Sequence, residues 1–421
     1  MLLLHLARQS LSNRLLTTSL TALSIAFSVA LLVGVENVRT GMRESFSNTV
    51  SGTDLIVGSR GGTIQLMLYS VFGLGSPVAN ISHETWEEWD DHPAVSWTIP
   101  YALGDSHQGF RVIGTNESFY EHYKYRGGQS ISLAEGRPAE EVFDVVLGSQ
   151  VAERLGYGLG DPISVTHGIS DVGFMNHDEM PFEVIGILDE TFTPVDRAIY
   201  VTLEGITAIH LGWEEGGPPM PGEEIHADHV HEMDEIHVSQ ITSFFLGAES
   251  RAYTLQLQRE ISTSEQEPLT AVIPGLALSE MWQGIGYAED GLMVISGFVV
   301  LVGLLGMLVS IYTSLDARRR EMAILRALGA GPRRIVSLLV LEAGLLSALG
   351  AFLGVIFVYA GLAALQPWLE GEFGLLVPIR VLDQAQLMYI GAVIILGFVA
   401  GLVPALKAYR TALHDGLSVR V

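Results

Sequence analysis

The sequence predicts an α-helical membrane protein with four transmembrane helices and a large α+β extracytoplasmic domain inserted between the first two of them. The first observation is composition, because 48% of the 421 residues are apolar and only 17% are charged. That balance is too apolar for an ordinary soluble protein and too charged for a chain that lies wholly in lipid. The second observation is a set of four long apolar runs, and the third is a strongly uneven distribution of charge along the chain.

The four apolar runs define the predicted membrane spans. They are placed at residues 15–35, 291–314, 335–365 and 387–406. A helix needs about 20 residues to cross the hydrocarbon core of a bilayer, and Glu342 is the single charged residue within these runs. A cleaved signal peptide is the alternative for the first run. Its apolar stretch is longer than a usual signal core and no A-x-A site follows it, so a retained span is favoured.

Basic residues flank the spans on one side of the predicted membrane. The segments 1–14, 315–334 and 407–421 each carry more Lys and Arg than Asp and Glu. Basic segments next to a span stay in the cytoplasm, so both termini and the 315–334 segment are predicted there. The long segment 36–290 and the short loop 366–386 are then predicted to lie outside.

The segment 36–290 is acidic, with 40 Asp and Glu against 11 Lys and Arg. Such a surface repels phosphate, which excludes nucleic acid as a partner. Patterning predicts mixed structure, with strands at 143–147, 163–166, 182–188 and 198–202, a helix at 149–155, and a helix at 279–290 that continues into the second span. A Gly- and Pro-rich stretch at 216–222 marks the edge of a subdomain.

Motifs of common enzymes are missing from the sequence. The chain has no cysteine, and therefore no disulfide, thiolate ligand or cysteine nucleophile. It contains neither H-E-x-x-H nor G-x-S-x-G, so no catalytic residue is assigned. A membrane-anchored sensor or enzyme is the alternative of another class, and a sensor would need a cytoplasmic output domain for which the predicted segments leave no room.

A cluster of arginines lies between the second and third spans. The segment 315–334 holds six of the 23 Lys and Arg residues, and its composition from Arg318 to Leu328 strongly favours a helix. Met322, Leu325 and Leu328 recur at steps of three, and Ile324 precedes Leu328 by four, so they would form one apolar face of that helix. The glycines after the helix would end it. The basic residues alone fit a topology anchor, whereas the apolar face and the glycine hinge favour docking of a partner. The residues predicted to make that contact are Arg318, Arg319, Arg320, Glu321, Met322, Leu325, Arg326, Leu328, Gly329 and Ala330.

These residues also carry a resemblance to a known family. The stretch RRREMAILRALGAGPRRI at 318–335 resembles the signature of the MacB/FtsX-type ABC transporter permeases. The stretch at 2–20 resembles the amphipathic entry helix of that family, so residues 1–14 are expected to form such a helix in the cytoplasm. The stretches at 144–163 and 401–410 resemble the periplasmic core motif and the closing segment of the family. Two further stretches, 54–58 and 193–201, are similar to a branch of stand-alone permeases.

The resemblance implies the place and the partners of the protein. It implies a multi-pass protein of the bacterial inner membrane with a periplasmic domain, in which the 315–334 segment contacts a cytoplasmic ABC ATPase dimer. A second copy of the permease or a paralogue, membrane lipids and a soluble periplasmic partner complete the expected assembly. The expected cargo is a lipoprotein, a peptide or a similar molecule.

Nucleotide chemistry is expected to reside in the partner. No G-x-x-x-x-G-K-[ST] motif occurs, because neither Lys124 nor Lys407 follows a glycine. The chain is therefore predicted not to be an enzyme and to bind no cofactor directly, while ATP and Mg²⁺ act through the ATPase subunit.

Four histidines interleaved with carboxylates raise a second hypothesis. His226, His229, His231 and His237 lie in one acidic stretch, and imidazole with carboxylate is a typical ligand set for zinc. The alternative is a solvated acidic loop that binds nothing specific. If the histidines bind zinc, the protein would belong to a zinc-linked transport system whose outer loop binds or hands over the metal.

Glu342 is the intramembrane polar candidate. It lies roughly 10 Å into the third span by helical rise, and intramembrane carboxylates are candidates for function. Its moderate depth favours a structural place at a helix–helix contact. Small residues that allow close helix packing are predicted at Gly344, Gly350, Gly354, Gly391, Gly397 and Gly401.

Overall fold

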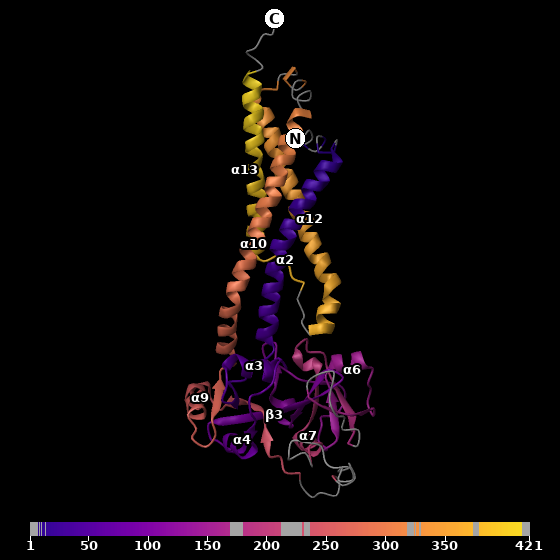
Figure 1. The fold of residues 1–421 in the computed structure, drawn as a ribbon, viewed down its shortest axis with the longest axis vertical. Helices are drawn as coiled ribbons and strands as arrows, with labels where there is room; N and C mark the ends of the chain where they lie inside the picture. The colour runs from indigo at the N-terminus through magenta and orange to yellow at the C-terminus, as the bar shows by residue number, and fades with distance from the viewer. Residues whose placement is uncertain are drawn as a thin grey trace. The chain divides into compact units, whose positions relative to one another are not determined.

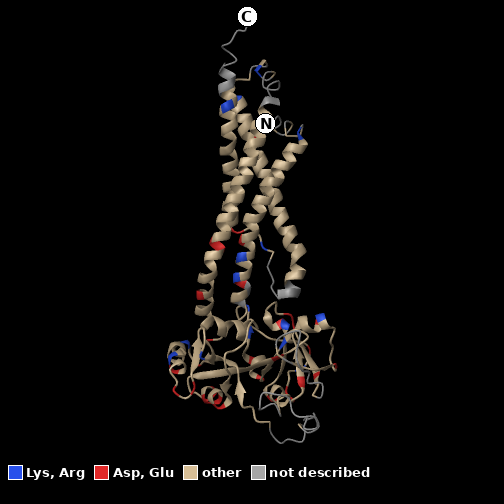
Figure 2. Ribbon diagram, in the orientation of Figure 1, with Lys and Arg blue, Asp and Glu red and all other residues tan. Residues whose placement is uncertain are grey.

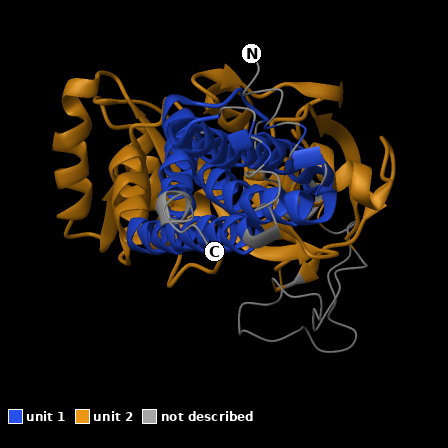
Figure 3. Cartoon of the chain, turned by 90° about the horizontal axis from the view of Figure 1, so that it is seen from above, with its two compact units in different colours: residues 1–41, 285–367, 377–421 blue, residues 42–284, 368–376 orange. Residues whose placement is uncertain are grey.

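The computed structural model describes most of the chain. It describes residues 14–168, 180–211, 236–317, 330–373 and 379–414, with isolated positions at 7, 9, 11, 12, 230, 324, 326 and 327. The chain forms two compact units (Figure 3). We call residues 1–41, 285–367 and 377–421 the helical unit, and residues 42–284 and 368–376 the sheet unit.

Four helices are long and apolar enough to cross a membrane. They are α2 (Leu15–Asn48), α10 (Pro274–Ala317), α12 (Pro332–Phe373) and α13 (Gln384–His414) (Figure 1). Lys, Arg, Asp and Glu are sparse along the middle of these helices (Figure 2). The predicted fold class is confirmed, because a large mixed α/β domain lies between the first and the second of the four.

Two of these helices cross the boundary between the units without a break. The last residues of α2, from Met42 onward, belong to the sheet unit, as do the first residues of α10, up to Gly284. The helix predicted over 279–290 is confirmed as part of α10.

Small residues allow the helices of the helical unit to approach closely. A Cβ atom added at Gly350 of α12 would lie 2.6 Å from the Cβ of Ile25 on α2, and one added at Gly401 of α13 would lie 2.6 Å from that of Ala343. Both distances are shorter than van der Waals contact, so only glycine fits. Gly344, Gly354 and Gly397 are similarly enclosed, whereas Gly391 faces open space, and there the predicted close packing is wrong.

The sheet unit is built on one mixed sheet. Its central order is β15-β1-β14-β3-β4-β12-β8-β11-β7, with β10 paired to β3 and β9 paired to β11. The strands are β1 (Leu55–Ser59), β3 (Val95–His107), β4 (Phe110–Thr115), β7 (Leu133–Gly136), β8 (Asp144–Leu147), β9 (Pro162–Ile163), β10 (Thr166–His167), β11 (Phe182–Leu188), β12 (Ala198–Thr202), β14 (Ser243–Ala248) and β15 (Leu269–Val272). Two small ladders pair β2 (Ile81–Ser82) with β13 (Gln240–Ile241) and β5 (Lys124–Tyr125) with β6 (Gln129–Ser130).

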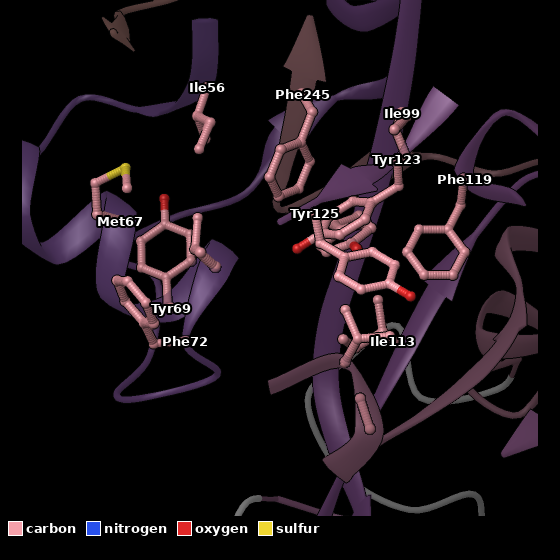
Figure 4. Close-up of a cluster of buried hydrophobic side chains, with 14 of the residues drawn as sticks. Ile56, Met67, Tyr69, Phe72, Ile99, Ile113, Phe119, Tyr123, Tyr125 and Phe245 are labelled. Carbon is pink, nitrogen blue, oxygen red and sulfur yellow. The ribbon is translucent and has the colours of Figure 1, made fainter. Parts of the chain in front are cut away.

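Short helices cover this sheet. They are α3 (Thr63–Val71), α4 (His83–Asp90), α5 (Ser118–His122), α6 (Ser149–Leu155), α7 (Leu203–Ala208) and α9 (Thr254–Ser262), with 3₁₀ turns η1 (Pro194–Arg197) and η2 (Arg251–Tyr253). Successive strand residues face opposite sides, so Ile56 and Phe245 join one apolar cluster while Leu55, Val57 and Phe244 join another. Figure 4 shows part of the first cluster.

The strand–helix unit from β8 to α6 follows the sequence prediction. Asp144 begins β8 and accepts hydrogen bonds from the backbone N–H groups of Glu140 at 3.0 Å and Glu141 at 2.9 Å. Its carboxylate also pairs with Arg137, with the closest N···O distance at 2.6 Å. Gly156 ends α6 with a φ of 73°, a left-handed conformation that glycine adopts without steric cost.

A buried aspartate shapes the turn before β12. Asp196 is fully buried and accepts hydrogen bonds from the backbone and hydroxyl of Thr191 and from the backbone of Phe192. Burial raises the pKa of Asp196, and these hydrogen bonds oppose the rise. The turn fixes η1, which lines the cavity described below.

Candidate functional site

The candidate coupling segment connects α10 to α12. Its residues Arg318, Arg319, Arg320, Glu321, Met322, Leu325, Leu328 and Gly329 lie outside the described residues. Arg326 and Ala330 are half-buried, and Ile324 is 61% exposed. The contact that these residues are predicted to make with an ATPase therefore stays a prediction.

The helix ends that carry this segment are packed together. Leu315 near the end of α10, Ile335 and Leu339 at the start of α12, and Ala405 and Ala408 on α13 form one buried apolar cluster. Because this cluster joins three helices, a displacement of the segment between α10 and α12 would reach α13 as well.

Basic side chains surround the same cluster. The guanidinium of Arg14 donates to the carbonyl oxygen of Ser314 at 3.3 Å. The Lys407 ammonium lies 3.7 Å from the centre of the Tyr312 ring, a cation–π contact. Arg333 and Arg334 at the start of α12 are exposed. This end of the helical unit therefore presents positive charge beside the candidate coupling segment.

Glu342 lies on α12 within the helical unit and is fully buried. The following turn is tightly packed, since the Ser347 hydroxyl donates to the sulfur of Met307 at 3.5 Å. Burial of the carboxyl group among packed helices is compatible with the structural place expected for it, and its role stays a prediction.

Three of the four candidate zinc ligands, His226, His229 and His231, lie outside the described residues. The fourth, His237, is exposed. Across the described part of the chain, no group of three or more His, Asp and Glu side chains is arranged to hold a metal ion. The zinc hypothesis therefore rests on the sequence alone.

A half-buried histidine pairs with a buried aspartate of the sheet unit. His210 Nε2 is 3.4 Å from an oxygen of Asp105, which is fully buried, and His210 Nδ1 is 2.7 Å from the carbonyl oxygen of Ile206. Burial alone would lower the pKa of His210, but the hydrogen bond and charge of Asp105 outweigh it, so the pKa is raised. Burial lowers the pKa of His107, whose Nδ1 lies 2.7 Å from the carbonyl oxygen of Ser164.

Sequence reasoning missed a cavity of about 450 Å³ inside the sheet unit. It lies among the last residues of α2, α3, β3, β4 and η1, and Arg111 on β4 lines it. The available signal was a single arginine in the otherwise apolar run from Phe110 to Ile113. Its burial could not be inferred from the sequence, because the residues around it come from distant segments.

Two family descriptions match the chain. The MacB-like periplasmic core domain matches residues 18–255, and the FtsX-like permease C-terminal domain matches residues 293–413. Among solved structures, the periplasmic region of MacB from Actinobacillus actinomycetemcomitans is similar at 11% identity and a TM-score of 0.33, covering 55% of this chain and 93% of that one. The extracellular domain of the noncanonic ABC-type transporter YknZ from Gram-positive bacteria is similar at 13% identity and a TM-score of 0.30, covering 52% and 98%. No curated protein matches the chain significantly.

Proposed function

This chain belongs to the MacB/FtsX-type permeases of ABC transporters, and we propose that it passes motion from a separate ATPase to its outer domain. It is a multi-pass membrane protein with a periplasmic or extracellular domain, and a permease of this type implies an ATPase partner. We propose further that both termini and the coupling segment face the cytoplasm, as the basic residues beside the spans indicate.

The observation that carries this proposal is the continuity of α2 and α10. Each helix runs unbroken from the helical unit into the sheet unit. A hydrogen-bonded helix resists bending, so a tilt imposed at one end is carried along its length. No lumen through the helices is needed for such transmission.

The coupling segment supplies the other half of the proposed mechanism. ATP binding would close a dimer of ATPases, whose groove holds the helix predicted from Arg318 to Leu328. The permease can respond only if the ATPase contacts that helix differently in its two states. A homodimer, or a heterodimer with a paralogue, would then move two outer domains against each other to extract a lipoprotein, a peptide or a similar cargo.

Replacing Leu328 with Asp tests the docking role. Leu328 belongs to the predicted apolar face, whereas Ala327 is exposed and lies about 100° around the same predicted helix, outside that face. We expect Leu328→Asp to abolish co-purification of the ATPase, and Ala327→Asp to retain it. Both variants should insert in the membrane at wild-type levels. Retention of the ATPase by Leu328→Asp would reject the docking role.

A zinc-linked transport system is the second candidate, carried by the spacing of His226, His229, His231 and His237. Calorimetric titration of the full-length protein with zinc chloride tests it. We expect saturable binding that is lost when the first three histidines are replaced together by alanine. Heat of equal size from both proteins would end this candidate.

A further inference from the structure

The cavity in the sheet unit has the size and lining of a small-molecule site. Its volume of about 450 Å³ lies in the range of ~300–1,000 Å³ that such sites occupy. Apolar side chains form most of its walls, including Phe46 from α2, Phe72 from the end of α3 and Val195 from η1. In Figure 4, Tyr69 and Phe72 lie on one side and Ile113 and Tyr123 on the other. All four of these residues line the cavity.

A buried cation lies at this apolar cavity. Arg111 is 7% exposed, and its Nη2 donates to the carbonyl oxygen of Gly75 at 2.6 Å. Its Nε and Nη1 are buried and make no hydrogen bond. Among the described residues that line the cavity there is no Asp or Glu. A guanidinium held in this way is costly, because burial removes its hydration and no carboxylate replaces it.

The surrounding residues hold Arg111 in place rather than neutralise it. Gly73 and Gly75 have φ angles of 64° and 79°, and this glycine turn brings a single carbonyl oxygen to the guanidinium. Arg197 is a second cationic side chain in the lining. Tyrosines also line the cavity, but burial raises the pKa of Tyr69 to about 12, so its hydroxyl stays neutral. The described residues of the lining therefore hold the Arg111 guanidinium without a carboxylate beside it.

We propose that this cavity binds an amphiphilic anion, whose carboxylate or phosphate head pairs with Arg111 and whose single apolar chain lies against the aromatic walls. A bound anion would accept hydrogen bonds from Nε and Nη1, the two donors that the protein leaves unpaired. A free fatty acid and a lysophospholipid share this chemistry. The proposal does not depend on ATPase docking, because all residues that line the cavity belong to the sheet unit.

The site has a consequence for the helices. The end of α2 contributes to the wall of the cavity. Met42 and Phe46 in the helix and Thr49, which directly follows it, line the cavity. An occupant would therefore contact the same helix that continues through the helical unit. Binding would stabilise one placement of that helix end relative to the strands around it.

Titration of the purified full-length protein in a neutral detergent tests the proposal. The probes are sodium octanoate, octan-1-ol and octylammonium chloride, which share a tail and differ in the charge of the head. An octanoyl lysophosphatidate is the fourth probe and distinguishes the phosphate source from the carboxylate source. Binding is followed by calorimetry and by the rise in unfolding temperature, with detergent alone as the blank.

The variants separate a binding role of Arg111 from a structural one. Arg111→Gln removes the charge, and Arg251→Gln is the matched control, because Arg251 is exposed on η2 of the same unit. Ala198 on β12 lines the cavity and lies opposite Arg111 in the pairing of β12 with β4. Ala198→Leu therefore narrows the cavity beside Arg111. Because Arg111 makes one hydrogen bond and no ion pair with described residues, Arg111→Gln should fold with an unfolding temperature close to that of the wild type.

We expect saturable binding of octanoate or of the lysophosphatidate by the wild type and by Arg251→Gln. Octanol and octylammonium should bind at least about tenfold more weakly, and Arg111→Gln should bind the anions about 10- to 100-fold more weakly. Ala198→Leu should weaken the binding of every probe, because all of them carry the same apolar tail. Equal binding of octanol and octanoate, unchanged binding by Arg111→Gln, or no saturable binding of either anion would overturn the proposal.

Discussion

Asp144 should be the most sensitive charged residue of the β8–α6 unit. It is 5% exposed and accepts hydrogen bonds from two backbone N–H groups, at 3.0 Å and 2.9 Å. Replacing it with alanine leaves both donors without an acceptor. Each charge-assisted hydrogen bond contributes about 1.5 kcal/mol, so Asp144→Ala should lower the free energy of unfolding by about 3 kcal/mol.

The ion pair with Arg137 should matter much less. The Arg137 side chain is 44% exposed, so solvent screens its interaction with Asp144 and the pair contributes no more than about 1 kcal/mol. Arg137→Ala should therefore lower the free energy of unfolding much less than Asp144→Ala. The loss of unfolding free energy caused by Asp144→Asn should lie between the losses caused by these two variants, because the amide oxygen of Asn can still accept hydrogen bonds from both backbone N–H groups.

Tryptophan fluorescence during chemical unfolding of the full-length protein measures these differences. All six tryptophans belong to the sheet unit, so the signal reports on that unit. The reasoning assigns the stability to the backbone hydrogen bonds rather than to the ion pair. A loss from Arg137→Ala equal to or greater than that from Asp144→Ala would refute it.

Two further predictions concern helix packing and pH. Gly350→Leu should reduce the yield of monodisperse protein in size-exclusion chromatography, because its side chain would collide with Ile25, whereas Gly391→Leu should leave the yield unchanged. The raised pKa of His210 means that its pair with Asp105 stabilises the folded protein fully below about pH 6.5, and that this contribution is lost as the pH rises through the folded pKa. The wild type should therefore lose more stability between pH 6 and pH 8 than Asp105→Asn; equal losses would contradict the assignment.

Local sequence patterns were sufficient to predict the bounds of several strands and helices of the sheet unit. The strands predicted at 182–188 and 198–202 and the helix at 149–155 are confirmed with the same bounds. Each is a short run rich in Val, Ile or good helix formers, bounded by Gly, Pro or Asp, so neighbouring residues alone specify it.

The pairing of strands that are distant in sequence could not be predicted from such local patterns. The longest strand, β3, contains Pro100 and Gly104, which weaken any strand pattern, and it is held by partners from β14 and β4. The strand order places β1 beside β14 and β15, which are about 200 residues away in sequence. Burial of Arg111 depends on the same long-range pairing, and therefore the cavity was missed while the apolar runs of the spans were recognised.

The pairing of β1 with β15 restricts how the two long helices can move. β1 follows α2, β15 precedes α10, and the two strands are antiparallel neighbours with Ile56 opposite Val272. A slip of β15 against β1 by a single residue would offset the two strands by about 3.3 Å, and their side chains would exchange faces. The hydrogen-bonded pair thus opposes any movement of one helix that would shift its strand against the other strand, whereas a joint movement of both strands leaves the pair intact.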